Sequence, residues 1–409
     1  MMTVVAWKSA PVMKSAASAM VVLLLAVQLP TVAAEEVIEI GPPEGMPAKC
    51  QPNDIDLDSA GRPWFPCTGS DLPGKEDSVG VIEPSTKKVA LYDVPDGCGP
   101  YMGAFDARGR YWFSMRDCNK LGMIDPAAGP QVNEYPVETN GTEPKGIGID
   151  RSGKVWVALV TQPPTEPDSV GRFDPASKSW DIVKLNQSGT NLLDLTVLKS
   201  GKVIVCDFLA GGIYRFDAST MAYELVPIPK VFEPTWCRES PDGYLFVTSH
   251  GPNTYVRKID SNDKPVDLLY PQVGLLPYAI AFDRDGHAWI TEHLGNHIHR
   301  IAKDGTWGPR ISLLTPQSYP FSIAIDQKNC DAWVGENAGN RIAYIPGTML
   351  CPKPTAFRLG LLDYIIIGVI ASVVFALVNT IIIRRKKQKA QAGPVSKEQV
   401  EKQKAKDSL

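Results

Sequence analysis

The chain has 409 residues, of which 44% are hydrophobic and 21% are charged, so it has ample apolar material for a folded core. A formal net charge of −3 argues against a dedicated nucleic-acid binder, and we expect no nucleic-acid partner. The 34 glycines and 35 prolines exceed average usage but stay below the range of disordered or collagen-like chains. This composition indicates many turns between short elements.

The first 34 residues follow the pattern of a secretory signal peptide. Lys8 and Lys14 precede an apolar run over residues 16–29, and a small-residue stretch ends at Ala34. We expect cleavage after Ala34, which would leave the body of the chain outside the cytosol. The alternative is an uncleaved signal anchor.

The body repeats one pattern seven times, at steps of 42 to 48 residues. The pattern is Pro-x-x-h-x-h-Asp-x-x-Gly-x-x-Trp, where h is apolar. Its Pro position falls at Pro52, Pro100, Pro144, Leu192, Pro234, Pro277 and Pro320. Its aromatic position falls at Trp64, Trp112, Trp156, Ile204, Phe246, Trp289 and Trp333. A unit of this length that repeats this often is typical of a β-propeller.

Each copy predicts four strands, and the seven copies predict an all-β, seven-bladed propeller over residues 35–350. Six or eight blades are the alternatives. The seventh copy runs into Gly347 and Pro352 before a fourth strand can form. Residues 37–42 have the pattern of a spare strand, so we expect the N-terminal strand to complete the last blade and close the ring.

Eight cysteines all lie between Cys50 and Cys351. An even number in a body outside the cytosol predicts disulfide bonds, although the spacing leaves their pairing open. The sequence contains no cysteine and histidine cluster with zinc-site spacing. Asn140 and Asn186 begin Asn-x-Ser/Thr triplets, which makes both candidate glycosylation sites.

Near the C-terminus, residues 364–383 are twenty residues without a formal charge, long enough to span a bilayer as a helix. A juxtamembrane linker (351–363) precedes them. The tail, residues 384–409, carries nine Lys/Arg against three Asp/Glu. The positive-inside rule then predicts a cytoplasmic tail and an extracytoplasmic, single-pass propeller. A buried soluble helix is the alternative. Gly368, Ser372 and Ala376 recur at four-residue spacing, which would suit a transmembrane homodimer.

The repeat resembles that of the virginiamycin B lyases, which are streptogramin-inactivating seven-bladed propellers. The residues that carry the resemblance are Pro277-Tyr278-Ala279-Ile280, Trp289-Ile290-Thr291-Glu292 and Asn296-His297-Ile298-His299-Arg300-Ile301. The resemblance covers residues 36–346. It implies a magnesium-assisted elimination, in which a general base removes a carbon-bound proton.

The same family places a histidine directly after the Pro of late repeats, and this chain departs from that pattern. The corresponding residues here are Asn53, Tyr101, Lys145, Leu193, Thr235, Tyr278 and Phe321. The family's glutamates after the Trp strand do match, at Glu292 and Glu336. The resemblance therefore carries the fold more firmly than the activity.

The residue after each Pro and the residues three and four after each Trp are predicted to meet on one face of the propeller, as a funnel. We expect this funnel to bind a ligand through Asn53, Tyr101, Arg116, Lys145, His250 and Tyr278, with Asp54 and Asp194 also present. Candidate catalytic residues are Glu292 and His293. Candidate ligands for Mg²⁺ or Ca²⁺ are Asp207, Glu292 and Glu336. The alternative is a polar channel mouth filled with water.

Two functions follow from this sequence. One is a membrane-anchored extracytoplasmic propeller that binds a small molecule or a protein at its funnel. The other is a Mg²⁺- or Ca²⁺-assisted lyase or lactonase that acts on an ester or lactone.

Overall fold

The computed structural model describes residues 36–42, 45–46, 49–69, 77–209, 211–228, 233–251, 255–260, 264–269, 275–352 and 361–391, together with Lys404. The predicted signal peptide, most of the linker and most of the tail lie outside these residues. The chain forms two units, Met1–Cys351 and Pro352–Leu409. Each is described by itself.

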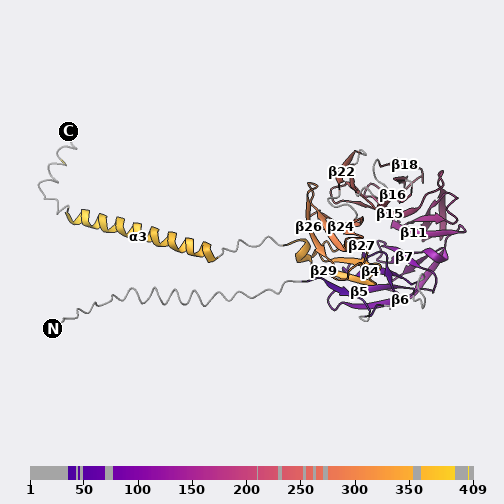
Figure 1. The fold of residues 1–409 in the computed structure, drawn as a ribbon, viewed down its shortest axis with the longest axis horizontal. Coiled ribbons are helices and arrows are strands. Elements are labelled where there is room, and N and C mark those ends of the chain that lie inside the picture. The colour runs from indigo at the N-terminus through magenta and orange to yellow at the C-terminus, as the bar shows by residue number, and fades with distance from the viewer. Residues whose placement is uncertain are drawn as a thin grey trace. The chain divides into compact units, whose positions relative to one another are not determined.

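The first unit is a seven-bladed β-propeller, as the repeat predicts, and its sheets follow one another around a ring (Figure 1). Blade 1 consists of β2 (Gln51–Pro52), β3 (Asp56–Leu57), β4 (Pro63–Thr68), β5 (Ser78–Glu83) and β6 (Lys88–Asp93). Blade 2 consists of β7 (Pro100–Phe105), β8 (Tyr111–Met115), β9 (Lys120–Ile124) and β10 (Val132–Pro136), with the 3₁₀ helix η1 (Arg116–Cys118) after β8. Blade 3 consists of β11 (Thr142–Ile149), β12 (Val155–Thr161), β13 (Ser169–Asp174) and β14 (Ser179–Lys184).

The remaining four blades have the same order from the channel outwards. Blade 4 consists of β15 (Leu192–Val197), β16 (Lys202–Asp207), β17 (Gly212–Asp217) and β18 (Tyr223–Pro227). Blade 5 consists of β19 (Pro234–Glu239), β20 (Leu245–Ser249), β21 (Tyr255–Ile259) and β22 (Pro265–Leu269). Blade 6 consists of β23 (Pro277–Phe282), β24 (Ala288–Glu292), β25 (His297–Ile301) and β26 (Trp307–Ser312). Blade 7 consists of β27 (Pro320–Ile325), β28 (Ala332–Glu336), β29 (Arg341–Ile345) and β1 (Ile38–Ile40).

The N-terminal strand completes blade 7, which confirms the predicted closure. β1 pairs antiparallel with β29, with Ile38 opposite Tyr344 and Ile40 opposite Ile342. The first and last segments of the propeller are therefore hydrogen-bonded to each other. The short helix α2 (Gly347–Leu350) follows β29, and a disulfide joins Cys351 to Cys330 in the β27–β28 turn.

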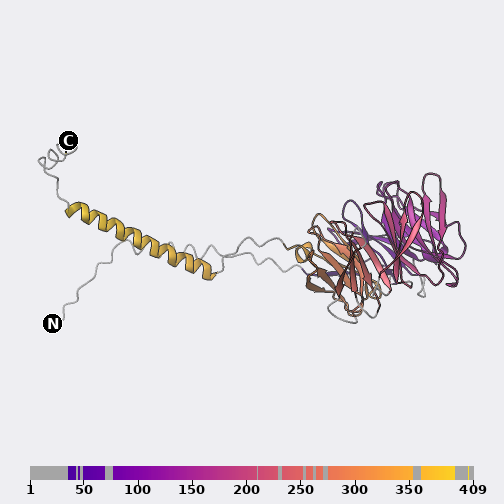
Figure 2. The same ribbon diagram turned by 90° about the horizontal axis from the view of Figure 1, so that it is seen from above.

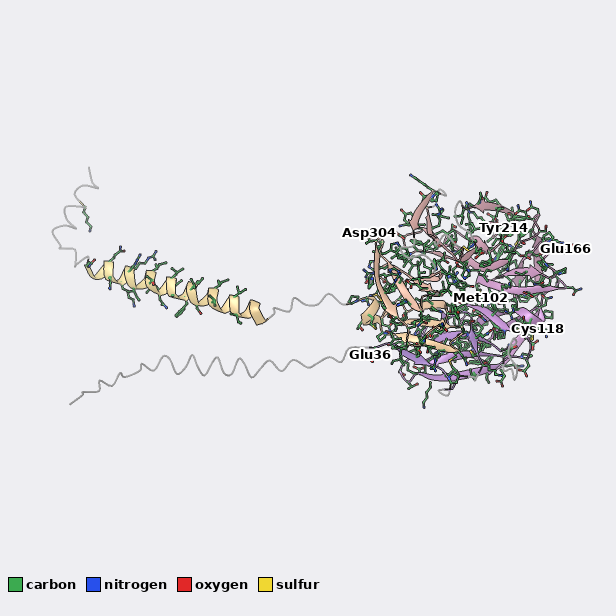
Figure 3. All side chains as sticks on the ribbon, viewed as in Figure 1. Glu36, Met102, Cys118, Glu166, Tyr214 and Asp304 are labelled. Atoms are coloured by element: carbon green, nitrogen blue, oxygen red, sulfur yellow. A yellow bond between two sulfur atoms is a disulfide. The ribbon has the colours of Figure 1, made fainter. Side chains whose placement is uncertain are left out.

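The recurring Asp, Gly and Trp form one structural device at the turn between the first two strands of a blade. In blade 6, Asp283 Oδ1 accepts the backbone amide of His287 at 2.9 Å, and Oδ2 accepts the indole N–H of Trp289 at 2.9 Å. The turn glycine has a positive φ, as at Gly153 (+81°), which other residues adopt with strain. The indole is fully buried between blades. Figure 3 shows side chains filling the propeller, with Met102 of β7 near the middle of the ring.

The central channel has two ends, which we name by the sequence at each. At the Pro end, first strands begin and second strands finish, since Pro277 pairs with Glu292. At the turn end, the Asp-x-x-Gly turns join these strands. A β-bulge interrupts the pairing just after the Pro position in blades 2 to 7, for example between Pro277 and Ile280. In blade 1 the first strand is split there into β2 and β3. A bulge changes the direction in which the neighbouring side chains point, and here it acts on the side chains at the Pro end of the first strands.

The cysteines form four disulfides: Cys50–Cys67, Cys98–Cys118, Cys206–Cys237 and Cys330–Cys351. The prediction of disulfides is thus supported, and the structure supplies the pairing that the spacing left open. Cys206–Cys237 is the bond that joins two blades, since Cys206 lies on β16 and Cys237 on β19.

The second unit is the helix α3 (Leu361–Gln391), one unbroken helix in Figure 2. Its segment Gly368–Gln388 is long and apolar enough to cross a membrane. The predicted transmembrane stretch 364–383 lies within this helix. The helix continues through the basic residues that follow, so the predicted start of the tail is helical as well.

Candidate functional site

An aromatic wall lies at the Pro end of the channel, and it gathers residues from blades 5 to 7. We define it as Trp236, His250, Tyr278, His293, Tyr319 and Phe321. The ring centroids of Tyr278 and Phe321 are 4.2 Å apart, and those of Tyr278 and His293 are 4.9 Å apart. His293 also lies 5.6 Å from His250 and 5.1 Å from Tyr319. The predicted residues His250, Tyr278 and His293 are therefore brought together.

The predicted ligand residues omit three members of this wall. Phe321 occupies a post-Pro position, and the repeat places that position in the funnel. Tyr319 precedes the same Pro, and Trp236 follows Thr235 across the bulge of blade 5. The bulge turns Trp236 towards Tyr278, with centroids 5.5 Å apart, and a simple alternation of strand faces cannot anticipate that turn.

The two histidines of the wall differ in their surroundings. His250 Nδ1 lies 3.2 Å from a carboxylate oxygen of Glu233. Burial lowers the pKa of His293 to about 4, and the neighbouring His250 contributes to the shift. His293 is therefore a neutral imidazole at pH 7, able to accept a proton or a hydrogen bond.

A basic pair, Arg116 and Lys145, lies at the Pro end in blades 2 and 3. The Arg116 guanidinium stacks over Tyr101 at 5.3 Å from the ring centroid, and its Nε lies 2.7 Å from Asp117. Lys145 Nζ donates to Asn191 Oδ1 at 3.0 Å and lies 3.9 Å from a carboxylate oxygen of Glu143. Burial lowers the pKa of Lys145, while it raises the pKa of Tyr101 to about 12. Tyr101, Arg116 and Lys145 thus form a second group of predicted ligand residues.

Asn53 has a structural role in the geometry. Its side-chain Nδ2 donates to Thr68 Oγ1 at 2.9 Å, and its Oδ1 accepts from Asn337 Nδ2 at 2.7 Å. Asn53 belongs to blade 1 and Asn337 follows β28 in blade 7, so this amide joins the first and last blades of the ring. Its amide nitrogen and its carbonyl oxygen are both hydrogen-bonded there.

The position three residues after the aromatic does not face the funnel. Neighbouring residues of an extended strand point to opposite faces, so His293 joins the aromatic wall while Glu292 turns into its own blade. Glu292 is fully buried, and its carboxylate lies 3.1 Å from His299, 3.5 Å from His297 and 2.8 Å from Arg310 Nε. The two predicted catalytic residues are adjacent in sequence but separated by the strand.

The three predicted metal ligands occupy this same position in three different blades and are not brought together. Asp207 Oδ1 accepts the amides of Asn191 and Leu209, and Glu292 is paired with cations. Among the described residues, one trio has donor atoms close enough for an ion, namely Asp283, Asp285 and Cys351, and its cysteine is disulfide-bonded. The arrangement does not fit a shared Mg²⁺ or Ca²⁺ site built from Asp207, Glu292 and Glu336.

Glu336 has the opposite electrostatic environment to its counterpart Glu292. It is fully buried in blade 7 near Ser318 and Glu39. Burial raises the pKa of Glu336 to about 8, and the adjacent Glu39 carboxylate adds to the shift. Glu39 itself accepts the amide of Thr315 at 2.8 Å and lies 4.0 Å from Arg341. At neutral pH Glu336 is therefore mostly a protonated acid, whereas Glu292 is paired with a cation.

The two candidate glycosylation sites lie on the surface. Asn140 is exposed between β10 and β11, and Asn186 is exposed between β14 and β15. Both loops connect the outermost strand of one blade to the innermost strand of the next, so both sites lie on the Pro-end face. Their modification stays a prediction.

Comparison with known proteins identifies the fold. No protein-family model matches the chain, and no curated protein matches it. Among solved structures, a catalytically inactive virginiamycin B lyase from Staphylococcus aureus with quinupristin is similar at a TM-score of 0.67 and 17% identity, over 76% of this chain and 99% of that one. A streptogramin B lyase is similar at 0.66 and 20% identity, over 75% and 96%. The extracellular domain of a hybrid two-component system from B. thetaiotaomicron is similar at 0.59 and 13%, over 76% and 42%.

Proposed function

We propose that this protein is a membrane-anchored propeller, held outside the cytoplasm, that binds a planar organic anion at the Pro end of its channel. The observation that carries the proposal is the convergence of the aromatic wall from three blades with the basic pair from two others. Aromatic faces bind flat apolar groups, and the guanidinium and ammonium groups bind a carboxylate or phosphate. The four disulfides and the long apolar helix support the location.

The aromatic wall and the basic pair lie within electrostatic range of each other. The phenol of Tyr101 is one of the groups that raise the pKa of Tyr278, behind the larger effect of burial. Tyr101 is stacked under Arg116, and Tyr278 is stacked on His293. A ligand that contacts both phenols would therefore present its ring to the wall and its charge to the basic pair.

A second candidate function is a lyase or lactonase, and His293 is the observation that favours it. A neutral imidazole in a partly desolvated mouth can accept a proton, although its lowered pKa makes His293 a weaker base than an ordinary histidine. The similar solved structures include virginiamycin B lyases, one of them with quinupristin. A magnesium ion would supply charge stabilisation for an enolate, but the three predicted ligands do not form its site. In this second function His293 would act without a carboxylate from Glu292.

The test uses the full chain in lipid nanodiscs and isothermal titration calorimetry with 2-naphthoate. We expect 2-naphthoate to bind saturably. The uncharged 2-naphthalenemethanol should bind at least about tenfold more weakly. Tyr278→Ala and Lys145→Gln should each reduce the affinity for naphthoate. His293→Ala, which removes another ring of the aromatic wall, should reduce it as well. His287→Ala, in a turn at the opposite end of the channel, is the matched control for that variant and should leave the affinity unchanged. Equal affinity for the acid and the alcohol would refute the proposal.

The enzymatic alternative is tested by incubating the same preparation with quinupristin, with and without Mg²⁺ or Ca²⁺. Turnover that His293→Ala abolishes would establish the second function and replace the first. A thermal shift with either ion that Glu292→Ala removes would restore the metal hypothesis. A fully saturating ion at 100-fold its Kd would add about 2.7 kcal/mol to the free energy of unfolding.

A further inference from the structure

The turn end of the channel holds a cavity of about 600 Å³, distinct from the site at the Pro end. Residues of all seven first strands line it, and most of them are apolar, such as Ile147, Leu195, Ile280 and Ile323. This volume lies in the range of small-molecule sites. Its walls are rigid because each first strand is hydrogen-bonded to a second strand behind it.

A buried carboxylate lies in this cavity with unused hydrogen-bonding capacity. Asp54 is 7% exposed, and its Oδ2 accepts the amide of Gly103 at 3.0 Å. Among the residues that the structure describes, none donates a hydrogen bond to its Oδ1. Asp56, also in the cavity wall, differs because Leu57 and Phe105 donate backbone amides to its two oxygens.

Nearby charges are already committed to partners. Arg238 Nη1 lies 2.6 Å from Asp194, whose same oxygen also accepts the amide of Cys237. The Lys199 ammonium donates to the carbonyl oxygens of Ser240 and Pro241. Three carboxylates, those of Asp54, Asp56 and Glu239, line the cavity beside the cations Lys199 and Arg238. Because Asp194 already neutralises Arg238, the apolar cavity keeps an excess of negative charge when its carboxylates are ionised.

We propose that the turn-end cavity binds a small organic cation, an alkylamine whose ammonium group pairs with Asp54 and whose carbon chain lies against the isoleucine and leucine walls. An ammonium ion supplies the missing donors to Asp54 Oδ1, and the alkyl chain buries apolar surface that the channel otherwise exposes to water. An inorganic divalent ion is disfavoured, because Asp54, Asp56 and Asp194 do not place donor atoms within ligand distance of one another.

The electrostatics of Asp54 give the site a pH dependence. Burial raises the pKa of Asp54 to about 7. Arg238 opposes the shift, and Asp56 and Asp194 add to it. The phenols of Tyr101 and Tyr111 also lie within electrostatic range of Asp54. An alkylamine, with a pKa near 10.4, stays charged throughout. Its affinity should therefore rise as pH increases from 6 to 8 and Asp54 loses its proton.

The experiment measures binding of n-hexylammonium chloride to the full chain in nanodiscs by calorimetry, with empty nanodiscs as the blank. n-Hexanol and hexanoate are the matched probes with the same chain and a different head group. We expect hexylammonium to bind at least about tenfold more tightly than either at pH 8, with the advantage shrinking at pH 6. Absence of hexylammonium binding, or equal binding of hexanol, would overturn the proposal.

Two variants locate the site. Asp54→Asn keeps the acceptor for Gly103 and removes the charge, so it should lower hexylammonium affinity at least about tenfold. Glu134→Gln removes the same charge on the outer strand β10 and should leave the affinity unchanged. If Asp54→Asn does not fold, the pH series on the unmodified chain decides, and a flat series refutes the assignment. Calcium or magnesium ions that displace hexylammonium stoichiometrically would also refute it.

Discussion

Replacing Glu336 by glutamine tests the charge state of the ring closure. Glu336 of blade 7 is buried near the Glu39 carboxylate, which belongs to the closing strand β1. A carboxyl whose folded pKa is raised contributes stability that is complete below its unfolded pKa and is lost as pH rises through the folded value. The relevant window therefore runs from about 4.5, the usual value, to about 8. Glutamine is isosteric with the protonated acid and keeps a donor for Glu39.

The magnitude follows from the size of that window. Each pKa unit corresponds to about 1.4 kcal/mol of differential stability. Between pH 5 and pH 8 the unfolded carboxyl is mostly ionised while the folded one is mostly protonated, so the native chain should lose roughly 3 kcal/mol relative to Glu336→Gln. For a domain of roughly 300 residues, with an unfolding entropy near 0.6 kcal/mol per kelvin, this is a relative change in Tm of about 5 °C.

The assay is thermal unfolding of both proteins in nanodiscs, followed by near-ultraviolet circular dichroism from pH 5 to pH 8. The control is Glu292→Gln, the same position in blade 6, which removes an anion from beside Arg310 and should destabilise the chain throughout this range. A constant difference between native protein and Glu336→Gln would refute the reasoning. A difference that moves in favour of the native protein as pH rises would show that a cation holds Glu336 ionised.

Three further predictions concern the blades and the membrane anchor. Asp283→Ala removes the acceptor for Trp289 and for two turn amides, and should cost about 2 kcal/mol in denaturant unfolding, whereas the exposed neighbour Asp285→Ala should cost little. Replacing Cys206 and Cys237 by serine should cost roughly 3 kcal/mol in the same assay. A protease site appended after residue 409 should be cleaved by a protease expressed in the cytoplasm and not by one added outside intact cells. Cleavage by the external protease would contradict the proposed topology.

The repeat could be read from the sequence because one device recurs. An aspartate that holds both a turn and an indole needs fixed spacing, so Asp58, Asp106, Asp150 and Asp283 each bond the tryptophan six residues later. The closing strand was also predictable. The last repeat lacks a fourth strand, and residues 37–42 have a strand pattern that belongs to no other repeat, so the two complete one blade. The disulfide pairing was not, because it depends on which loops meet in space.

The candidate site was only half predictable, and the strand geometry explains why. The residues three and four positions after each aromatic lie on opposite faces of the second strand. The prediction nevertheless placed both in the channel. His293 does reach the channel, while Glu292 is captured by Arg310 and His299 of the outer strands. Those partners lie up to 18 residues away in the chain. The register of β24, β25 and β26 brings them next to Glu292, and the sequence does not give that register.

Blades 4 and 5 explain how the ring survives where the repeat is weakest. Their aromatic positions hold Ile204 and Phe246, and their aspartate positions hold Leu198 and Ser240, so neither can form the bond between aspartate and indole. The Cys206–Cys237 disulfide lies between these two blades, within a buried cluster that includes Ile204. A covalent bond thus joins the blades where the indole is missing. The same pair of blades contributes Asp194 and Arg238 beside the turn-end cavity, so loss of this disulfide should weaken hexylammonium binding as well as stability.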